Sequence, residues 1–186
     1  MGLGLFHLQQ RRAIDHAKFP GGTETTDVKL VRDLAIFDVT TRDAIPRVKV
    51  RNLQRTVPID VVDLEHFATK AVRCCVALHR RKPTDLTKLR EVFILLISDR
   101  RMASLHRQFL NQSGPTDVLT FQHGEIFISA ETARRNALAF RNSLERELQL
   151  YIVHGLLHLH GFDDQRGADA RKMKVMQERI LAKVLA

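Results

Sequence analysis

The sequence VHGLLHLHGFDD at residues 153–164 decides how the fold of the 186-residue chain is interpreted. It places His154 and His158 four residues apart, and on an α-helix such residues lie on one face with Cβ atoms about 5–6 Å apart. Gly161 follows as a turn, so that the carboxylate of Asp164 can fold back toward the two imidazoles. Three such groups can hold a divalent ion and leave a position for water, as in catalytic metal sites. The stretch therefore predicts a metalloprotease-like helix with an H-x-x-x-H pair and one bound divalent ion.

The residues around this pair refine the prediction. Gly155 stands where the H-E-x-x-H motif of zinc proteases carries its general base, so the helix offers two ligands and no built-in base. His160 falls on a different side of the helix from the pair. Asp163 can orient the turn or one of the ligands without binding the ion itself. The spacing alone also fits two histidines that are simply packed or exposed, and this alternative stays open.

The composition indicates one globular domain. Hydrophobic residues make up 44% of the chain, and no apolar run reaches the ~20 residues of a membrane span. The N-terminal sequence MGLGLFHLQQRR places its apolar stretch before the basic pair, the reverse of a secretory signal, so we expect a cytoplasmic protein. Cys74 and Cys75 are neighbours in an apolar helical pattern and are expected to be reduced core thiols rather than part of a disulfide framework.

The charge of the chain is unevenly distributed. Its net charge is +9 and its pI is near 10.1. Residues 1–46 hold six basic and six acidic side chains, so the whole excess falls on residues 47–186. A basic domain of this size favours a polyanionic partner, with nucleic acid first, although a solvated surface that is merely basic would give the same composition.

The pattern of apolar residues divides the chain at the same place. Residues 1–46 contain Pro20-Gly21-Gly22 and no sustained periodicity, which predicts a weakly ordered N-terminal extension. From Arg47 onward strand and helix signals alternate, which predicts an α/β (α+β) domain with a small mixed sheet and helices packed on it. Strands are expected at 47–53, 91–98, 117–121 and 125–129, and helices at 60–79, 99–110, 130–160 with a break near 141–143, and 168–185.

Three segments of this domain resemble one known family. Residues 154–164 read H-G-L-L-H-L-H-G-F-D-D, residues 115–121 read P-T-D-V-L-T-F, and residues 124–129 read G-E-I-F-I-S. In this order and spacing they are similar to the signature H-G-x-L-H-L-x-G-Y-D-H and to the segments P-T-D-V-L-S-F and G-D-I-x-I-S of the YbeY family of bacterial rRNA maturation factors. Met173 also falls where such chains usually carry methionine. The resemblance covers residues 47–186.

The resemblance implies a fold and an activity. It implies an α/β fold with a small four-stranded sheet and about five helices, a zinc-like ion, and a single-strand-specific endoribonuclease. In the family this activity is linked to maturation of the 3′ end of small-subunit (16S) rRNA and to ribosome quality control. The expected partners are therefore rRNA and the small ribosomal subunit, with no membrane and no small-molecule cofactor. The metal ligands that carry over are His154, His158 and Asp164.

The chain departs from the family pattern at three places. Asp164 stands where the family has its third histidine, and a carboxylate shifts the metal preference from Zn²⁺, still the first expectation, toward Mn²⁺, Fe²⁺ or Ni²⁺. Leu110 stands where the family usually has an arginine implicated in RNA handling, and Arg107, one helical turn earlier, is the candidate substitute. The loop between Phe121 and Gly124 is also shorter than usual.

Metal-assisted hydrolysis of a phosphodiester is the mechanism expected for these residues. Arg101 and Arg107 are the candidates for holding the RNA backbone. Thr116 and Asp117 are expected to organise the floor of the cleft, although a capped turn before the strand explains the same two residues. Two other functions stay open. One is a non-catalytic, RNA-binding ribosome-assembly factor with a structural metal, which the missing arginine favours, and the other is a metallopeptidase, which the missing glutamate disfavours.

Overall fold

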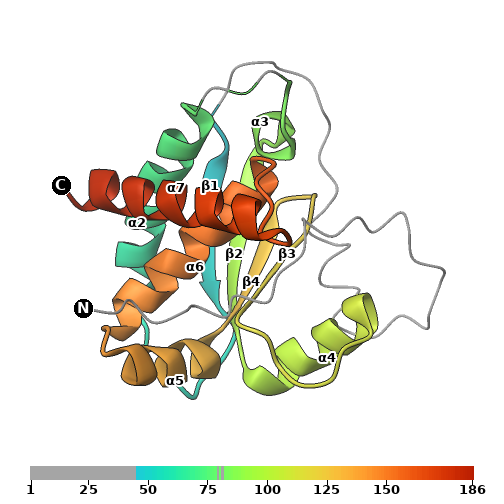
Figure 1. The fold of residues 1–186 in the computed structure, drawn as a ribbon. Helices are drawn as coiled ribbons and strands as arrows, with labels where there is room; N and C mark the ends of the chain where they lie inside the picture. Colours follow the sequence, from blue (N-terminus) through green and yellow to red (C-terminus); the bar gives the residue numbers. More distant parts are fainter. Residues whose placement is uncertain (1–44, 79, 81) are drawn as a thin grey trace.

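Four strands and six helices make up the part of the chain that the structure, a computed structural model, describes: residues 45–78, 80 and 82–186 (Figure 1). The elements follow in the order β1 (Arg47–Asn52), α2 (Val61–Val76), α3 (Asp85–Lys88), β2 (Glu91–Ile97), α4 (Asp99–Leu110), β3 (Val118–Thr120), β4 (Glu125–Ser129), α5 (Ala130–Phe140), α6 (Leu144–Leu159) and α7 (Gly167–Leu185). All helices except α7 begin at a side chain that caps the first turn, and these caps are Asp60, Thr84, Ser98, Ser129 and Ser143.

The strands form one mixed sheet in the order β1-β2-β4-β3. β1 pairs parallel with β2, β2 pairs parallel with β4, and β3 lies antiparallel to β4 at the edge. The parallel pairs are connected through helices, because parallel neighbours need a crossover between them. β2 is therefore a central strand, and its continuous apolar sequence is buried on both faces.

Alternate residues of β2 face two separate apolar clusters. Val92 and Ile94 belong to the larger cluster, which also holds residues of α2, α6 and α7. Phe93 and Leu95 belong to the smaller cluster, which holds residues of α4. Since side chains alternate between the two faces of a strand, α4 covers one face of the sheet, while α2, α6 and α7 lie on the other side (Figure 1).

The structure confirms the small mixed four-stranded sheet, and most predicted helix bounds agree to within a few residues. The element that the sequence did not reveal is α3, a four-residue helix before β2, which brings the helices to six rather than about five. Thr84 and Thr87 cap this helix reciprocally. A single turn is too short to show an apolar period in the sequence, so it could not be recognised there.

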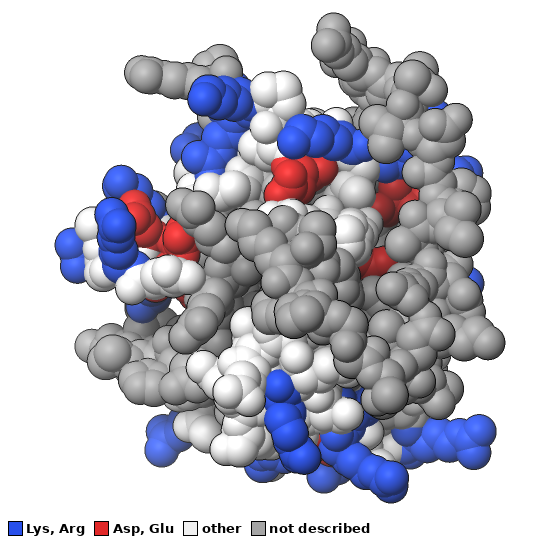
Figure 2. Space-filling model, turned by 90° about the vertical axis from the view of Figure 1, so that its right-hand side faces the viewer, with Lys and Arg blue, Asp and Glu red and all other residues white. Residues whose placement is uncertain are grey.

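The predicted extension at residues 1–46 lies, apart from its last two residues, outside the described residues. Cys74 is half-buried and Cys75 is buried on α2, and both are free thiols. None of the described helices combines the length and the apolar character needed to cross a membrane. Figure 2 shows Lys and Arg side chains at the top, at the left and along the lower edge of one face, with fewer acidic side chains among them.

Candidate metal centre

The histidine pair lies on α6, which runs through the larger apolar cluster. Ser143 caps its first turn, and its last thirteen residues are all buried. Gly155 allows a close approach to the sheet, since a Cβ at this position would meet Ile126 Cγ2 at 2.7 Å and Thr120 Oγ1 at 3.1 Å. Glycine disfavours a helix by ~1 kcal/mol relative to alanine, and the close packing of α6 on the sheet explains why a glycine stands here.

The side chains of His154, His158 and Asp164 converge on one point. The two Nε2 atoms are 2.9 Å apart. Asp164 folds back beyond the turn and places Oδ2 3.6 Å from the Nε2 of His154 and Oδ1 3.9 Å from the Nε2 of His158. Ligand atoms that each lie about 2.0–2.2 Å from one ion can be at most about 4.4 Å apart. The three groups therefore meet the distance condition for a shared ion.

Both imidazoles are oriented by oxygen atoms on their far side. His154 Nδ1 lies 3.3 Å from Gln177 Oε1, and His158 Nδ1 lies 3.2 Å from the carbonyl oxygen of Phe162. A carbonyl oxygen can only accept, so His158 donates through its Nδ1–H and keeps a lone pair on Nε2. The same assignment for His154, with the amide oxygen of Gln177 as acceptor, leaves two Nε2 lone pairs that face each other.

Burial and charge explain why this arrangement suits a cation. Burial lowers the pKa of His154 well below its usual value and lowers the pKa of His158 to about 4, so both rings are neutral. Burial, followed by the charge of Asp163, raises the pKa of Asp164 to about 7. Within the described part of the chain, the buried Oδ1 of Asp164 has no hydrogen-bond partner. One divalent ion would satisfy both lone pairs and this carboxylate oxygen, so the residues present fit a metal.

Gln177 is the site residue that the sequence did not reveal. It is buried on α7, 23 residues after the histidine that it orients. In the sequence it lies on the same side of its helix as the buried residues Met173 and Ile180, where an apolar residue would be expected. A lone polar residue on an apolar helix face is the signal that could have identified it.

Asp163 lies in the turn between α6 and α7. Its Oδ1 accepts a hydrogen bond from the backbone N–H of Gln165 at 3.1 Å. Its charge acts on both neighbouring ligands, since it favours the protonated forms of His158 and Asp164 and thereby contributes to raising the pKa of each. This placement agrees with a residue that orients the turn and influences the ligands without belonging to the converging group.

His160 joins the end of α6 to the segment that follows α2. Its Nδ1 lies 3.1 Å from Thr84 Oγ1, and its Nε2 lies 3.1 Å from the carbonyl oxygen of Leu78. Arg80 Nε donates to the carbonyl oxygen of His160 at 3.1 Å. The ring therefore points away from the histidine pair, as the helical spacing predicts, and it anchors the start of the turn that carries Asp164.

Thr116 and Asp117 are both buried just before β3. The hydroxyl of Thr116 donates to Asp117 Oδ1 at 3.0 Å, and the backbone N–H of Val118 donates to the same oxygen at 2.9 Å. Burial raises the pKa of Asp117 to about 6, and the charge of Asp117 contributes to the raised pKa of Asp164. These two hydrogen bonds fix the carboxylate of Asp117 just before β3, from where its charge acts on Asp164. The role of Thr116 and Asp117 in the floor of a cleft stays a prediction.

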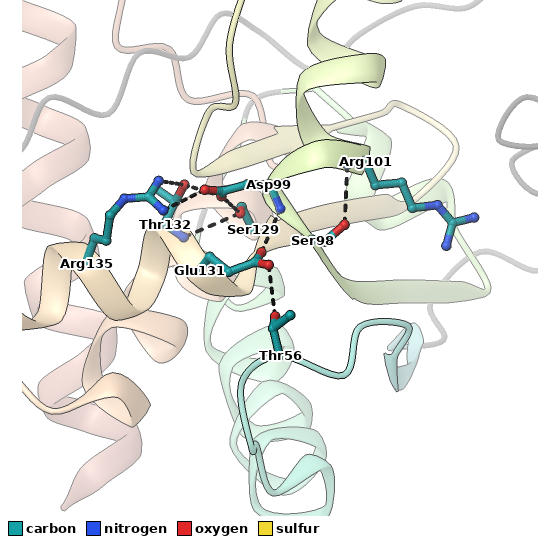
Figure 3. A network of polar contacts seen from close by, with 8 residues as sticks. All are labelled: Thr56, Ser98, Asp99, Arg101, Ser129, Glu131, Thr132 and Arg135. Carbon is teal, nitrogen blue, oxygen red and sulfur yellow. Dashed lines mark hydrogen bonds and ion pairs between the residues drawn. The ribbon is translucent and has the colours of Figure 1, made fainter.

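The arginines suggested by the sequence both lie on α4. The sheet separates this helix from α6. Figure 3 shows the side chain of Arg101 extending away from the hydrogen bonds that surround Asp99 and Glu131. Arg107 is exposed near the end of the helix, and Leu110 packs against the smaller apolar cluster. Contact of either arginine with RNA stays a prediction.

The fold and the site together define a class: an α/β protein in which one buried helix and the turn after it present three groups suited to a divalent ion. A family model described as Endoribonuclease YbeY matches residues 49–185. Endoribonuclease YbeY of Gluconobacter oxydans (strain 621H) is 38% identical over 115 residues, which are 59% of this chain and 68% of that protein. Endoribonuclease YbeY of Thermus thermophilus is 41% identical over 103 residues, which are 49% of this chain and 74% of that protein.

A solved structure has the same fold. The solution structure of TM1509 from Thermotoga maritima matches with a TM-score of 0.53 and 26% identity, over 74% of this chain and 88% of that one. The chain belongs to the Endoribonuclease YbeY family. Membership confirms the resemblance found in the sequence motifs, the α/β fold and the enzyme class, a nuclease.

Proposed function

We propose that the chain is a metal-dependent endoribonuclease that cuts single-stranded RNA at the centre formed by His154, His158 and Asp164. The supporting observation is the convergence of these three groups on one point, with both imidazoles oriented by oxygen acceptors behind them. Residues 47–186 form the catalytic domain in this proposal, since the family match begins and ends within a few residues of these bounds.

Each residue of the centre has a chemical role. His154 and His158 present neutral Nε2 atoms, and the acceptors behind them fix the rings and strengthen them as ligands. Asp164 contributes a negative charge and an oxygen ligand, so Zn²⁺ is the first candidate and Mn²⁺, Fe²⁺ or Ni²⁺ also fit. A bound divalent ion would lower the pKa of a water molecule and polarise a phosphoryl oxygen, which is the chemistry that phosphodiester hydrolysis needs.

The surroundings of Gly155 argue against a metallopeptidase. In H-E-x-x-H enzymes the general base is the residue after the first histidine. Here that position faces the sheet, and a Cβ would lie 2.7 Å from Ile126 Cγ2 and 2.9 Å from its Cδ1. A glutamate at this position would be forced into the core rather than toward the ion site. The helix therefore has neither this base nor the room for one.

A second candidate is an RNA-binding ribosome-assembly factor that uses the metal only structurally. The observation that favours it is Leu110, which stands where the family resemblance leads us to expect an arginine. Leu110 is partly buried against the smaller apolar cluster and offers no charge to RNA. In this case the protein would bind RNA without cutting it.

The cellular setting follows from the family resemblance and from the charge. We propose that the substrate is the 3′ end of small-subunit (16S) rRNA, that the chain acts on the small ribosomal subunit in the cytoplasm, and that it takes part in ribosome quality control. The net charge of +9 and the basic side chains on the face in Figure 2 support a polyanionic partner.

One assay tests the proposal against its rivals. Purified protein is incubated with single-stranded rRNA fragments and, separately, with peptides, with and without a chelator. The nuclease proposal expects RNA cutting that the chelator abolishes and that His154→Ala and Asp164→Ala each remove. His66→Ala is the matched control, since His66 is exposed on α2, and it should cut like the wild type.

The other outcomes are also decisive. Tight RNA binding without cutting, in protein shown by elemental analysis to carry its metal, would replace the nuclease by the assembly factor. Cutting that survives both the chelator and the two substitutions would reject the metal centre as the active site.

A further inference from the structure

A pocket of about 550 Å³ opens at the turn between α6 and α7. Its lining includes three cationic side chains, from Arg80, Arg166 and Lys172, and two acidic side chains, from Asp163 and Asp169. Sequence patterns do not reveal this pocket, because its residues come from the segment after α2, from the turn after α6 and from the first turns of α7.

The pocket adjoins the metal centre. Phe162 forms part of its wall and also provides the carbonyl oxygen that orients His158. Asp163 forms another part, directly before the ligand Asp164 in the chain. A polymer that occupied the pocket would therefore lie beside the ion site.

Arg80 is fixed in place at this pocket. Its Nε donates to the carbonyl oxygen of His160, and its guanidinium lies over the ring of Phe162, 4.0 Å from the centroid. These contacts restrain the planar group before any ligand arrives. Its Nη atoms have no hydrogen-bond partner among the residues that the structure describes, so they can donate to an anion.

The start of α7 supplies the other two cations. Arg166 is the N-cap residue, its exposed side chain makes no capping hydrogen bond, and the N–H groups of this uncapped first turn favour an anion nearby. Lys172 pairs with Asp169 at 3.4 Å, and Asp163 accepts from a backbone N–H of the turn. The three cationic side chains of the lining outnumber its two acidic side chains, so the pocket keeps a positive balance.

We propose that this pocket binds a backbone phosphate of single-stranded RNA, through Arg80, Arg166 and Lys172, next to the phosphodiester at the metal centre. The inference rests on the proposed nuclease function for its choice of RNA as the polyanion. The pocket would then supply a cationic contact to RNA at the α6–α7 turn. The uncharged Leu110 on α4 cannot supply such a contact.

Equilibrium RNA binding by the full chain tests this proposal. The affinity for a short fluorescent single-stranded RNA is measured by anisotropy over a series of salt concentrations, in chelator so that no cutting occurs. The pocket variant combines Arg166→Gln with Lys172→Gln. The control variant combines Lys174→Gln with Arg179→Gln, which removes the same charge from exposed positions of α7 outside the pocket.

The pocket variant should bind roughly 10-fold more weakly at moderate salt, and its slope of log affinity against log salt should be less steep by about 0.7, the value for one lost phosphate contact to a single strand. The control should change affinity by less than about 2-fold. Equal losses in both variants, or no loss in the pocket variant, would overturn the pocket. Because no step requires cutting, wild-type protein that binds RNA and never cuts it would reject the nuclease and leave the pocket standing.

Discussion

Gln177 acts on the metal centre without offering a ligand atom to the converging group. Its amide oxygen lies 3.3 Å from His154 Nδ1 and fixes which ring nitrogen faces the ion site. Replacement by leucine keeps the apolar packing of α7 and removes this acceptor. We expect Gln177→Leu to lower metal affinity by roughly 10- to 100-fold, measured by competition with a chromophoric chelator.

Gln177→Glu is the matched control, because a carboxylate keeps an acceptor at the same distance along the side chain. It should bind metal within a few-fold of the wild type. Both variants should retain the helical circular-dichroism signal. If the leucine variant held the metal as tightly as the wild type, the orienting role of the amide oxygen would be wrong.

Gly155 sets how closely α6 can approach the sheet. Gly155→Ala gains up to about 1 kcal/mol of helix propensity, but its Cβ would lie 2.7 Å from the branched Cγ2 of Ile126. Overpacking of this kind costs about 1–3 kcal/mol, so we expect a net loss of stability in urea unfolding. Gly167→Ala is the control, since the nearest atom to its Cβ is 3.6 Å away at the end of an arginine side chain. A stabilised Gly155→Ala variant would contradict the close packing.

The residues of the site differ in how far the sequence could predict their positions. His154, His158 and Asp164 lie within eleven consecutive residues, so helix geometry and one glycine turn suffice to bring them together. Gln177 comes from another helix, and its contact exists only because α7 packs against α6. The pocket cation Arg80 comes from the segment after α2. No local period in the sequence encodes either contact.

Between elements, Asp99 joins the starts of α4 and α5 (Figure 3). Its carboxylate accepts hydrogen bonds from the hydroxyls of Ser129 and Thr132 and from Arg135 Nη1, the last at 2.6 Å. In return its backbone N–H donates to Glu131 Oε2 at 2.6 Å. These hydrogen bonds hold the starts of the two helices together beyond the carboxyl ends of the parallel strands β2 and β4.

This network predicts a pH dependence of stability. Burial acts to raise the pKa of Asp99, but the hydrogen bonds from Ser129, Arg135 and Thr132 together outweigh it, and the pKa lies below its ordinary value. A carboxyl whose pKa falls on folding stabilises the protein above its unfolded pKa of about 3.9, and this stabilisation is lost as pH falls through the lower folded pKa.

Asp99→Asn should therefore unfold at a lower temperature than the wild type near neutral pH, and the difference should shrink toward acid. Thermal unfolding followed by circular dichroism from about pH 7 to pH 3 spans the window around the unfolded pKa. Asp63→Asn is the control, since Asp63 is exposed in the first turn of α2. A difference between Asp99→Asn and the wild type that stays constant over this range would argue against a charged role for Asp99.

The elements themselves were largely predictable, but their order in the sheet was not. The apolar run of β2 and the alternation of β1 are local signals, and both strands begin where the sequence places them. The order β1-β2-β4-β3 depends on which strands pair across the molecule, and no local pattern contains that information. The short connection from Phe121 to Gly124 joins β3 directly to β4, whereas helices lie between the paired strands β1 and β2 and between β2 and β4.

Across the whole molecule, the metal centre connects elements that are distant in sequence. Its ligands come from α6 and the following turn, α7 supplies the acceptor for one histidine, and the segment after α2 is tied to the same turn through His160 and Arg80. An ion that binds here binds only the folded chain, because the ligands do not converge when the helix is unfolded. Binding free energy at this site is then also folding free energy.

Metal removal should therefore lower the melting temperature of the whole domain. At a free metal concentration about 100 times Kd the folded state gains about 2.7 kcal/mol, and a chain of this size shifts by about 2–4 °C per kcal/mol. We expect a chelator to lower Tm by roughly 5–11 °C, and added Zn²⁺ to restore it in a concentration-dependent way. His154→Ala lacks one ligand and should melt at the same temperature with and without chelator. Elemental analysis must first show that the wild-type protein carries metal. If chelation then left its Tm unchanged, the ion would not be held by His154, His158 and Asp164.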